Sequence, residues 1–148
     1  MNIKSLLSPD CVLFKHQCAS KKRLLETIAS HLCDHNTNLD PSNVFSALIA
    51  RERLGSTGLG MGIAIPHCRI ADCTQTIGVL VSLDTPIDFN ALDSEPVDII
   101  FVLVFPEDGH KDHLQTLAAI AETFSDKDCL QRMRESKSAQ ELYDIVTG

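Results

Sequence analysis

The sequence has no excess of basic charge, no long apolar run and no recognisable export signal. Its 148 residues carry 13 Lys and Arg against 20 Asp and Glu, a formal net charge of −7. Nucleic-acid binding depends on neutralising phosphates with Lys and Arg, so this balance argues against nucleic acid as a partner. No apolar stretch approaches the ~20 residues of a membrane span, and the opening MNIKSLLSPDCVLF is unlike a signal peptide. We therefore expect a cytoplasmic protein with no membrane insertion.

The chain also lacks internal repeats, low-complexity tracts and long linkers. We accordingly expect residues 1–148 to form a single domain, which is long enough to bury a sizeable core. A C-x-x-C pair is missing too, and the six cysteines are irregularly spaced. This pattern favours reduced thiols, most of them small hydrophobic core residues, over a disulfide framework.

Lysine is missing from the middle of the chain, where a glycine-rich loop would need it to bind a nucleotide. Residues 55–70 read GSTGLGMGIAIPHCRI, with four glycines in eight positions. No lysine occurs between Lys22 and Lys111, so the Walker phosphate loop is absent. The dinucleotide fingerprint also fails, because Ile63 stands three residues after Gly60. We therefore expect no nucleotide in this loop.

The same loop could still bind an anion through its backbone. Glycines permit close approach, and successive N–H groups can form an anion-binding concavity. Ser56 and Thr57 add two hydroxyl donors, so both are candidate phosphate-binding residues. An irregular helix-to-strand connection without any ligand is the alternative.

Helix and strand patterns alternate along the chain. Apolar residues at helical spacing predict helices over 20–34, 40–53 and 109–124, and capping residues predict helix starts at Ser20, Asp40, Ser125 and Ser138. Near-continuous apolar runs at 76–83 and 97–105 predict strands buried on both faces, with shorter strands at 62–67 and 87–89. Central strands with helices before, between and after them indicate an α/β sandwich.

His67 directly follows the short strand and Pro66. A histidine at a strand end lies where α/β folds commonly place their chemistry. A neutral imidazole has one nucleophilic nitrogen when an acceptor holds the proton on the other. Such a nitrogen can attack phosphorus and carry a phosphoryl group as a phosphoramidate. A partly buried structural histidine is the alternative.

His113 lies at one edge of the apolar stripe of residues 109–124, near the predicted start of that helix. Backbone N–H groups and the helix dipole favour an anion there. His113 could meet His67 at one sheet edge, whereas His110 is expected to be solvated. A histidine that is hydrogen-bonded in the core is the alternative for His113.

Two other chemistries remain open. Zinc could use His67, Cys68, His110 and His113, although residues 67 and 68 point to opposite sides of an extended chain. A Cys–His hydrolase using Cys68 or Cys73 lacks a strong local signature.

The long motif RERLGSTGLGMGIAIPH (51–67), followed by HLQTLAAIA (113–121), resembles a known family. It is similar to enzyme IIA of the phosphotransferase system, mannitol/fructose type, and most similar to the nitrogen-regulatory branch. The resemblance covers nearly the whole chain, from LLSPDCV to SAQELYDIVT. It implies an α/β fold with a single mixed β-sheet flanked by helices.

The resemblance also implies a set of roles. His67 corresponds to the phosphoryl acceptor, His113 to the second active-site histidine and Arg51 to the arginine before the glycine loop. The implied donor is a phosphohistidine of a small HPr-like carrier protein, and no metal, nucleotide or other cofactor is expected. Cys68 departs from the family pattern, which often continues IPHG or IPHA, and its effect on access or redox sensitivity stays open.

Three functions follow as hypotheses. The first is a regulatory phosphocarrier whose phosphorylation state is read by target proteins such as kinases or transporters. The absence of a fused transport domain before Gly148 favours it. The second is a sugar-transport enzyme IIA that passes phosphate to a separate IIB protein. The third is a binding module that is not phosphorylated, and the presence of both histidines and Arg51 argues against it.

Overall fold

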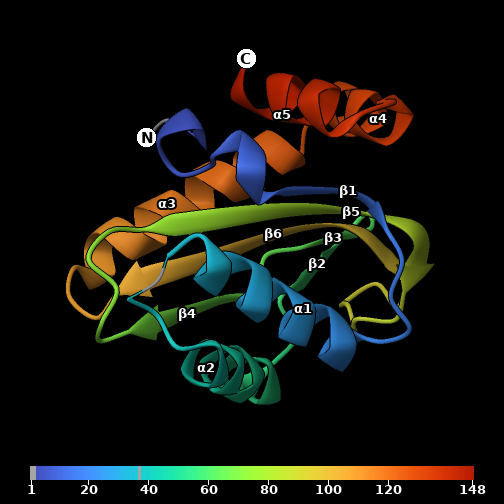
Figure 1. The fold of residues 1–148 in the computed structure, drawn as a ribbon. Helices are drawn as coiled ribbons and strands as arrows, with labels where there is room; N and C mark the ends of the chain where they lie inside the picture. The colour runs from blue at the N-terminus through green and yellow to red at the C-terminus, as the bar shows by residue number, and fades with distance from the viewer. Residues whose placement is uncertain (1–2, 37) are drawn as a thin grey trace.

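The alternating helices and strands build three layers, with one sheet between two groups of helices (Figure 1). The structure is a computed structural model that describes residues 3–36 and 38–148. Over these residues the sheet order is β1 (Val12–His16), β5 (Ile77–Ile87), β6 (Val97–Pro106), β3 (Ile63–Ala64) and β2 (Gly58–Gly60), with β4 (His67–Ile70) also paired to β6. β6 runs parallel to β3 and β4 and antiparallel to β5. The expected single mixed sheet is confirmed.

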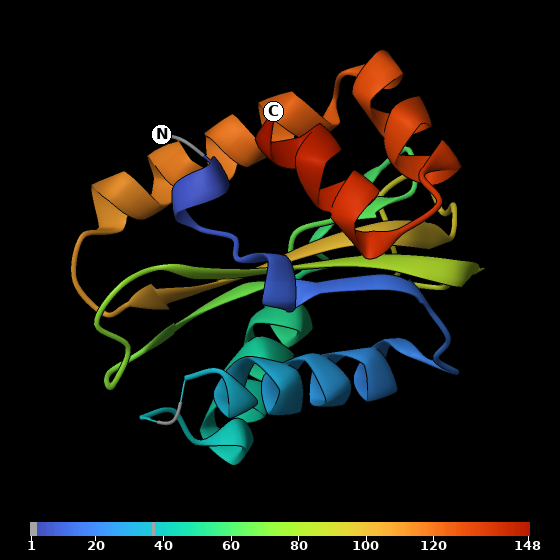
Figure 2. The ribbon, with the colours of Figure 1, turned by 45° about the horizontal axis from the view of Figure 1, so that its top comes forward.

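Helices cover both faces of this sheet (Figure 2). One face carries α1 (Lys21–Asp34) and α2 (Pro41–Leu54), and the other carries α3 (His110–Phe124), α4 (Lys127–Glu135) and α5 (Ala139–Thr147). Two 3-10 turns, η1 (Ile3–Ser5) and η2 (Pro9–Cys11), precede β1. Within the described residues, no helix has the length and apolar character needed to cross a membrane.

Most of the predicted helix starts are confirmed by their caps. The side chains of Ser20, Asp40 and Ser138 each accept a hydrogen bond from a backbone N–H of the following turn. The predicted start at Ser125 is wrong by one residue. Ser125 closes α3, and the Asp126 carboxylate caps α4 instead. Both neighbours can cap a helix, and the continuation of α3 through Phe124 decides between them.

The predicted strands at 76–83 and 97–105 are the central strands β5 and β6, whose middle residues are almost fully buried. The predicted edge strand at 87–89 is wrong. Ile87 is the last residue of β5 and pairs with Val97, whereas Phe89 lies beyond the strand as a buried core residue.

The predicted strand at 62–67 divides into two, because its pairing with β6 is interrupted. β3 ends at Ala64, and Pro66 has no N–H to donate, although its carbonyl still accepts from Leu103 N at 3.0 Å. Parallel pairing then resumes at His67, opposite Leu103. His67 therefore lies at the start of a second short strand, on the edge of the sheet.

Candidate active site

A cavity of about 620 Å³ opens beside β4, where α2 from one face of the sheet and α3 from the other approach the same edge. Its lining residues are Ala47, Ala50, Arg51 and Leu54 from α2, His67, Cys68 and Arg69 from β4, Phe105 from β6, and His110, His113, Leu114 and Leu117 from α3. The structure thus brings together three of the predicted site residues, His67, His113 and Arg51.

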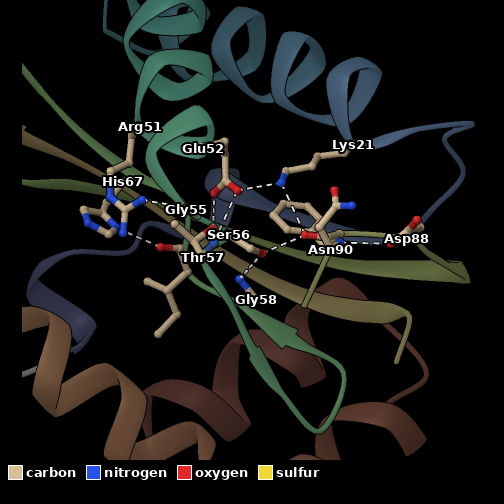
Figure 3. Close-up of polar contacts among 12 residues, drawn as sticks. Lys21, Arg51, Glu52, Gly55, Ser56, Thr57, Gly58, His67, Asp88 and Asn90 are labelled. Atoms are coloured by element: carbon tan, nitrogen blue, oxygen red, sulfur yellow. Dashed lines mark hydrogen bonds and ion pairs between the residues drawn. The ribbon is translucent and has the colours of Figure 1, made fainter. Parts of the chain in front are cut away.

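His67 is held in one tautomer by a backbone acceptor. Its Nδ1 lies 2.8 Å from the carbonyl oxygen of Ile65 (Figure 3). A carbonyl only accepts, so Nδ1 carries the proton and Nε2 keeps its lone pair. Burial lowers the pKa of His67, and the charge of Arg51 lowers it further, against the opposing effects of the Ile65 carbonyl and Glu52. The ring is therefore kept neutral, with Nε2 as its nucleophilic nitrogen.

His113 is buried at 8% exposure in the first turn of α3. Its ring stacks on Phe105 with centroids 4.2 Å apart, and Phe105 in turn meets the His67 ring edge-on at 6.5 Å. Burial lowers the pKa of His113, and the neighbouring His110 and Arg69 lower it further, against the opposing effects of the Asp112 carboxylate and of a hydrogen bond to the Asp108 backbone. Gly109 provides no side-chain cap for the helix. The backbone N–H groups at the N-terminal end of α3 favour an anion, and Asp112 adds a negative charge in the same turn.

Two arginines bring positive charge to the cavity. Arg51, in the last turn of α2, donates from Nη1 to the carbonyl oxygen of Gly55 at 2.7 Å. A guanidinium has five N–H donors, so further donors remain for a ligand. The second arginine, Arg69, places Nη1 at 2.6 Å from the ring nitrogens of His110.

The sequence analysis did not select Arg69, although a signal was present. Side chains two residues apart on a strand lie on the same side, so an arginine two positions after His67 shares its side of β4. The signal was missed because the strand was expected to end at Pro66.

Ser56 and Thr57 are not among the residues that line the cavity. The Ser56 hydroxyl donates to the Phe89 carbonyl at 2.7 Å and accepts from Gly58 N at 3.0 Å. Thr57 donates from both its hydroxyl and its backbone N–H to the carboxylate of Glu52 (Figure 3). Both hydroxyls therefore already donate to protein acceptors, Phe89 and Glu52.

Glu52 organises this second polar group, which we call the loop network: Glu52, Lys21, Ser56 and Thr57. The Glu52 carboxylate is 5% exposed and pairs with Lys21 Nζ at 2.6 Å. Lys21 also donates to the Phe89 carbonyl at 3.3 Å. Sequence reasoning did not select Glu52, although a signal was present. The last turn of a helix disfavours negative charge, so an acidic residue there indicates a specific partner.

The glycines of the loop serve packing more than anion binding. A Cβ on Gly58 would lie 2.8 Å from the Cβ of Ala91, and a Cβ on Gly62 would lie 2.4 Å from Arg134 Nη2. Gly62 also has a φ of +81°, which side chains disfavour. The loop therefore needs glycine because the chain passes close to neighbouring residues.

The geometry bears on the two other chemistries. Burial raises the pKa of the Cys68 thiol to about 12, so at neutral pH it is protonated and a poor nucleophile for a hydrolase. All six cysteines, each within the described residues, are free thiols. Over residues 3–36 and 38–148, the one group of three Cys, His, Asp or Glu ligand atoms within 4.8 Å of one another lies elsewhere, at Cys11, His31 and His35.

Comparison with known proteins gives the family of this chain. The family model described as "Phosphoenolpyruvate-dependent sugar phosphotransferase system, EIIA 2" matches residues 5–148. The chain belongs to this family.

Similar proteins place this enzyme IIA in the nitrogen-regulatory branch. The nitrogen regulatory protein of Escherichia coli is 44% identical over 148 residues, which cover 99% of this chain and 90% of that protein. The crystal structure of nitrogen regulatory protein IIA-Ntr from Neisseria meningitidis superposes with a TM-score of 0.92 at 37% identity, covering 98% of this chain and 99% of that one. IIA mannitol from Escherichia coli shares the fold, with a TM-score of 0.78 at 18% identity over 94% and 97% of the two chains.

Proposed function

We propose that this enzyme IIA is a regulatory phosphocarrier in which Nε2 of His67 accepts a phosphoryl group from a phosphohistidine of a small HPr-like protein. The observation that carries the proposal is the hydrogen bond from His67 Nδ1 to the Ile65 carbonyl, on a histidine that lines the cavity. This bond holds the proton away from Nε2, and burial keeps the ring neutral. A neutral, oriented imidazole is the form that attacks phosphorus.

The proposed step exchanges one P–N bond for another. The Nε2 lone pair of His67 attacks phosphorus, and the bond from phosphorus to the donor's ring nitrogen breaks, with its electron pair returning to that ring. The donor ring leaves as a neutral imidazole because its other nitrogen carries a proton, just as His67 keeps its proton on Nδ1. Transfer of this kind depends on in-line positioning and on stabilising the charge of the equatorial oxygens. Arg51 and His113 supply donors for these oxygens in our proposal, and Arg69 adds positive charge at the same cavity. Ser56 and Thr57 act in the loop network and are left out of the phosphate site.

Apolar residues at the cavity support a protein as donor. Leu54 and Leu114 line it and are 86% and 68% exposed. Exposed leucines beside the half-buried His67 suit a protein surface that covers the site during transfer.

Regulation is favoured over sugar transport by the similarity to nitrogen regulatory proteins. In this reading, target proteins such as kinases or transporters respond to whether His67 is phosphorylated. Transfer of labelled phosphate to a separate IIB protein would instead support the transport alternative.

The test is carrier-dependent phosphorylation with labelled phosphoenolpyruvate. Wild-type protein should acquire an acid-labile label, and His67→Ala should acquire none, because the variant lacks the Nε2 lone pair that attacks phosphorus in our proposal. His16→Ala changes a histidine of β1 outside the cavity and should label normally. An acid-labile label that persists in folded His67→Ala would contradict the proposal. His113→Ala should slow labelling by about 100-fold, the usual effect of losing one donor to a transition state.

A further inference from the structure

A second group of reactive side chains lies at the C-terminal end of α1, and none of its residues lines the cavity. The Sγ of Cys11 and one ring nitrogen each of His31 and His35 all lie within 4.8 Å of one another. Cys11 ends η2, just before β1, whereas His31 and His35 come from the last turn and the C-cap of α1. The two histidines are four residues apart on a helix, so they share one face, and their ring centroids are 4.8 Å apart.

We propose that Cys11, His31 and His35 bind a zinc ion. A thiolate and two imidazoles form the type of donor set that zinc prefers, with three protein ligands and a fourth position left for water. The family resemblance implied no metal, and the zinc alternative considered from the sequence used His67, Cys68, His110 and His113 instead. The folded structure brings residue 11 beside residues 31 and 35.

Each histidine has one ring nitrogen against a backbone carbonyl oxygen, which leaves its other ring nitrogen for zinc. His31 Nε2 lies 2.8 Å from the Asp10 carbonyl oxygen, and His35 Nδ1 lies 3.0 Å from the His31 carbonyl oxygen. A carbonyl only accepts, so these nitrogens carry the protons, and the other nitrogen of each ring keeps its lone pair. Metal-ligating histidines typically donate their second N–H to a carbonyl or carboxylate in this way.

Small side-chain movements complete the site. Ligand atoms on one tetrahedral zinc ion are about 3.5 Å apart, given bond lengths of about 2.0–2.3 Å, so the present spacing must close by roughly 1 Å. His35 is exposed and His31 half-buried, which leaves both rings room to turn. On binding, the Cys11 thiol loses its proton to solvent and the sulfur bonds to zinc.

The proposed ion would link the residue just before the edge strand β1 to the C-terminal end of α1. It shares no residue with the cavity, so zinc should stabilise the fold without being required for phosphoryl transfer. A ligand that binds the folded state alone stabilises it by mass action. At a zinc concentration 100 times Kd, we expect the melting temperature to rise by about 5–10 °C.

The experiment uses the full chain freed of metal and titrated with Co²⁺ alone, then with Zn²⁺ in competition. Co²⁺ should produce a thiolate charge-transfer band and tetrahedral d–d bands at one ion per chain, and Zn²⁺ should abolish both. His35→Ala, which changes an exposed side chain, should weaken binding by at least 10-fold, because loss of an outer partner alone costs about 10–100-fold. Cys11→Ser should remove the charge-transfer band.

Matched controls separate this site from the cavity. His16→Ala and Cys129→Ser change a histidine and a cysteine outside the group and should bind Co²⁺ as wild type does. No Co²⁺ binding to folded wild-type protein would overturn the proposal. So would binding that survives in His35→Ala but is lost in His67→Ala, which would place the metal in the cavity. Phosphoryl transfer can succeed or fail independently of either result.

Discussion

Arg51 and Glu52 are adjacent in the last turn of α2, yet they belong to two different kinds of polar site. Arg51 lines the open cavity beside His67. Glu52 is 5% exposed and accepts from Lys21 and from two donors of Thr57. Figure 3 shows the two side chains leaving the same helix end, one beside the His67 ring and one toward Lys21.

The two sites differ in how many hydrogen-bond donors and how much charge remain available to a ligand. In the loop network the charge of Glu52 is matched by that of Lys21, and both hydroxyls already donate to protein acceptors. At the cavity, Arg51 keeps unused donors, and among the described residues no ion pair joins Arg51 or Arg69 to a carboxylate. Polar groups whose hydrogen bonds are all made within the protein stabilise the fold, whereas an excess of positive charge attracts an anionic ligand.

The largest expected effect comes from breaking the loop network. Glu52→Ala removes the acceptor for Lys21 and Thr57, and a buried pair that loses one partner costs about 3 kcal/mol of the free energy of unfolding. Denaturant unfolding would measure it. Glu52→Gln, which keeps an acceptor for Thr57 but removes the charge, should fall between wild type and Glu52→Ala.

The matched control is Glu26→Ala on α1. Glu26 pairs with Arg23, and the two side chains are 50% and 72% exposed. An exposed pair of this kind contributes less than about 0.5 kcal/mol. Equal losses from Glu26→Ala and Glu52→Ala would show that the loop network has no special structural role.

The next largest effect is expected at the cavity, where a substitution should slow phosphoryl transfer without changing the stability of the fold. Arg51→Met keeps the length of the side chain and removes the charge, so it should slow phosphorylation by about 100-fold. The free energy of unfolding should change by less than about 0.5 kcal/mol. Arg53→Met alters an exposed arginine of the same turn that does not line the cavity and should leave the rate unchanged. A similar slowing in Arg53→Met would point to general electrostatic attraction of the donor.

Local patterns were enough to predict most of the fold. The caps at Ser20, Asp40 and Ser138 and the apolar runs of β5 and β6 record contacts between near neighbours in the chain. The failure at β4 depends on a distant partner. β4 exists because Leu103 and its neighbours offer a backbone edge to residues after Pro66, and nothing within the chain around His67 reveals that edge.

The candidate site also contains residues that local sequence patterns predicted and residues whose contacts they could not predict. His67, His113 and Arg51 were selected from a motif and from helical position, and the structure brings them to one cavity. Ser56 and Thr57 were expected at the phosphate because their residue types suit it. Their hydroxyls instead meet Phe89 and Glu52. Sequence alone could not show that these donors were already in use.

The smallest effect tests whether the two polar sites act on His67 with opposite signs. Arg51 lowers the pKa of His67 and Glu52 raises it, so Arg51→Met should raise that pKa and Glu52→Gln should lower it. An NMR titration of the His67 ring in each variant would measure both shifts. Shifts in the same direction in both variants would mean that the two residues do not act on His67 with opposite signs.

The same pKa has a consequence for stability. Because burial lowers the pKa of His67 in the folded state, the unfolded chain, with a histidine pKa of about 6.5, binds the proton first as the pH falls. In the window between the lowered folded value and about 6.5, the free energy of unfolding should therefore decrease with decreasing pH. His67→Gln should flatten this part of the stability profile, whereas His16→Gln should leave it intact. Raising the folded-state pKa through Arg51→Met narrows the window, so that variant should lose less stability across it than wild type does, even though it transfers phosphate more slowly.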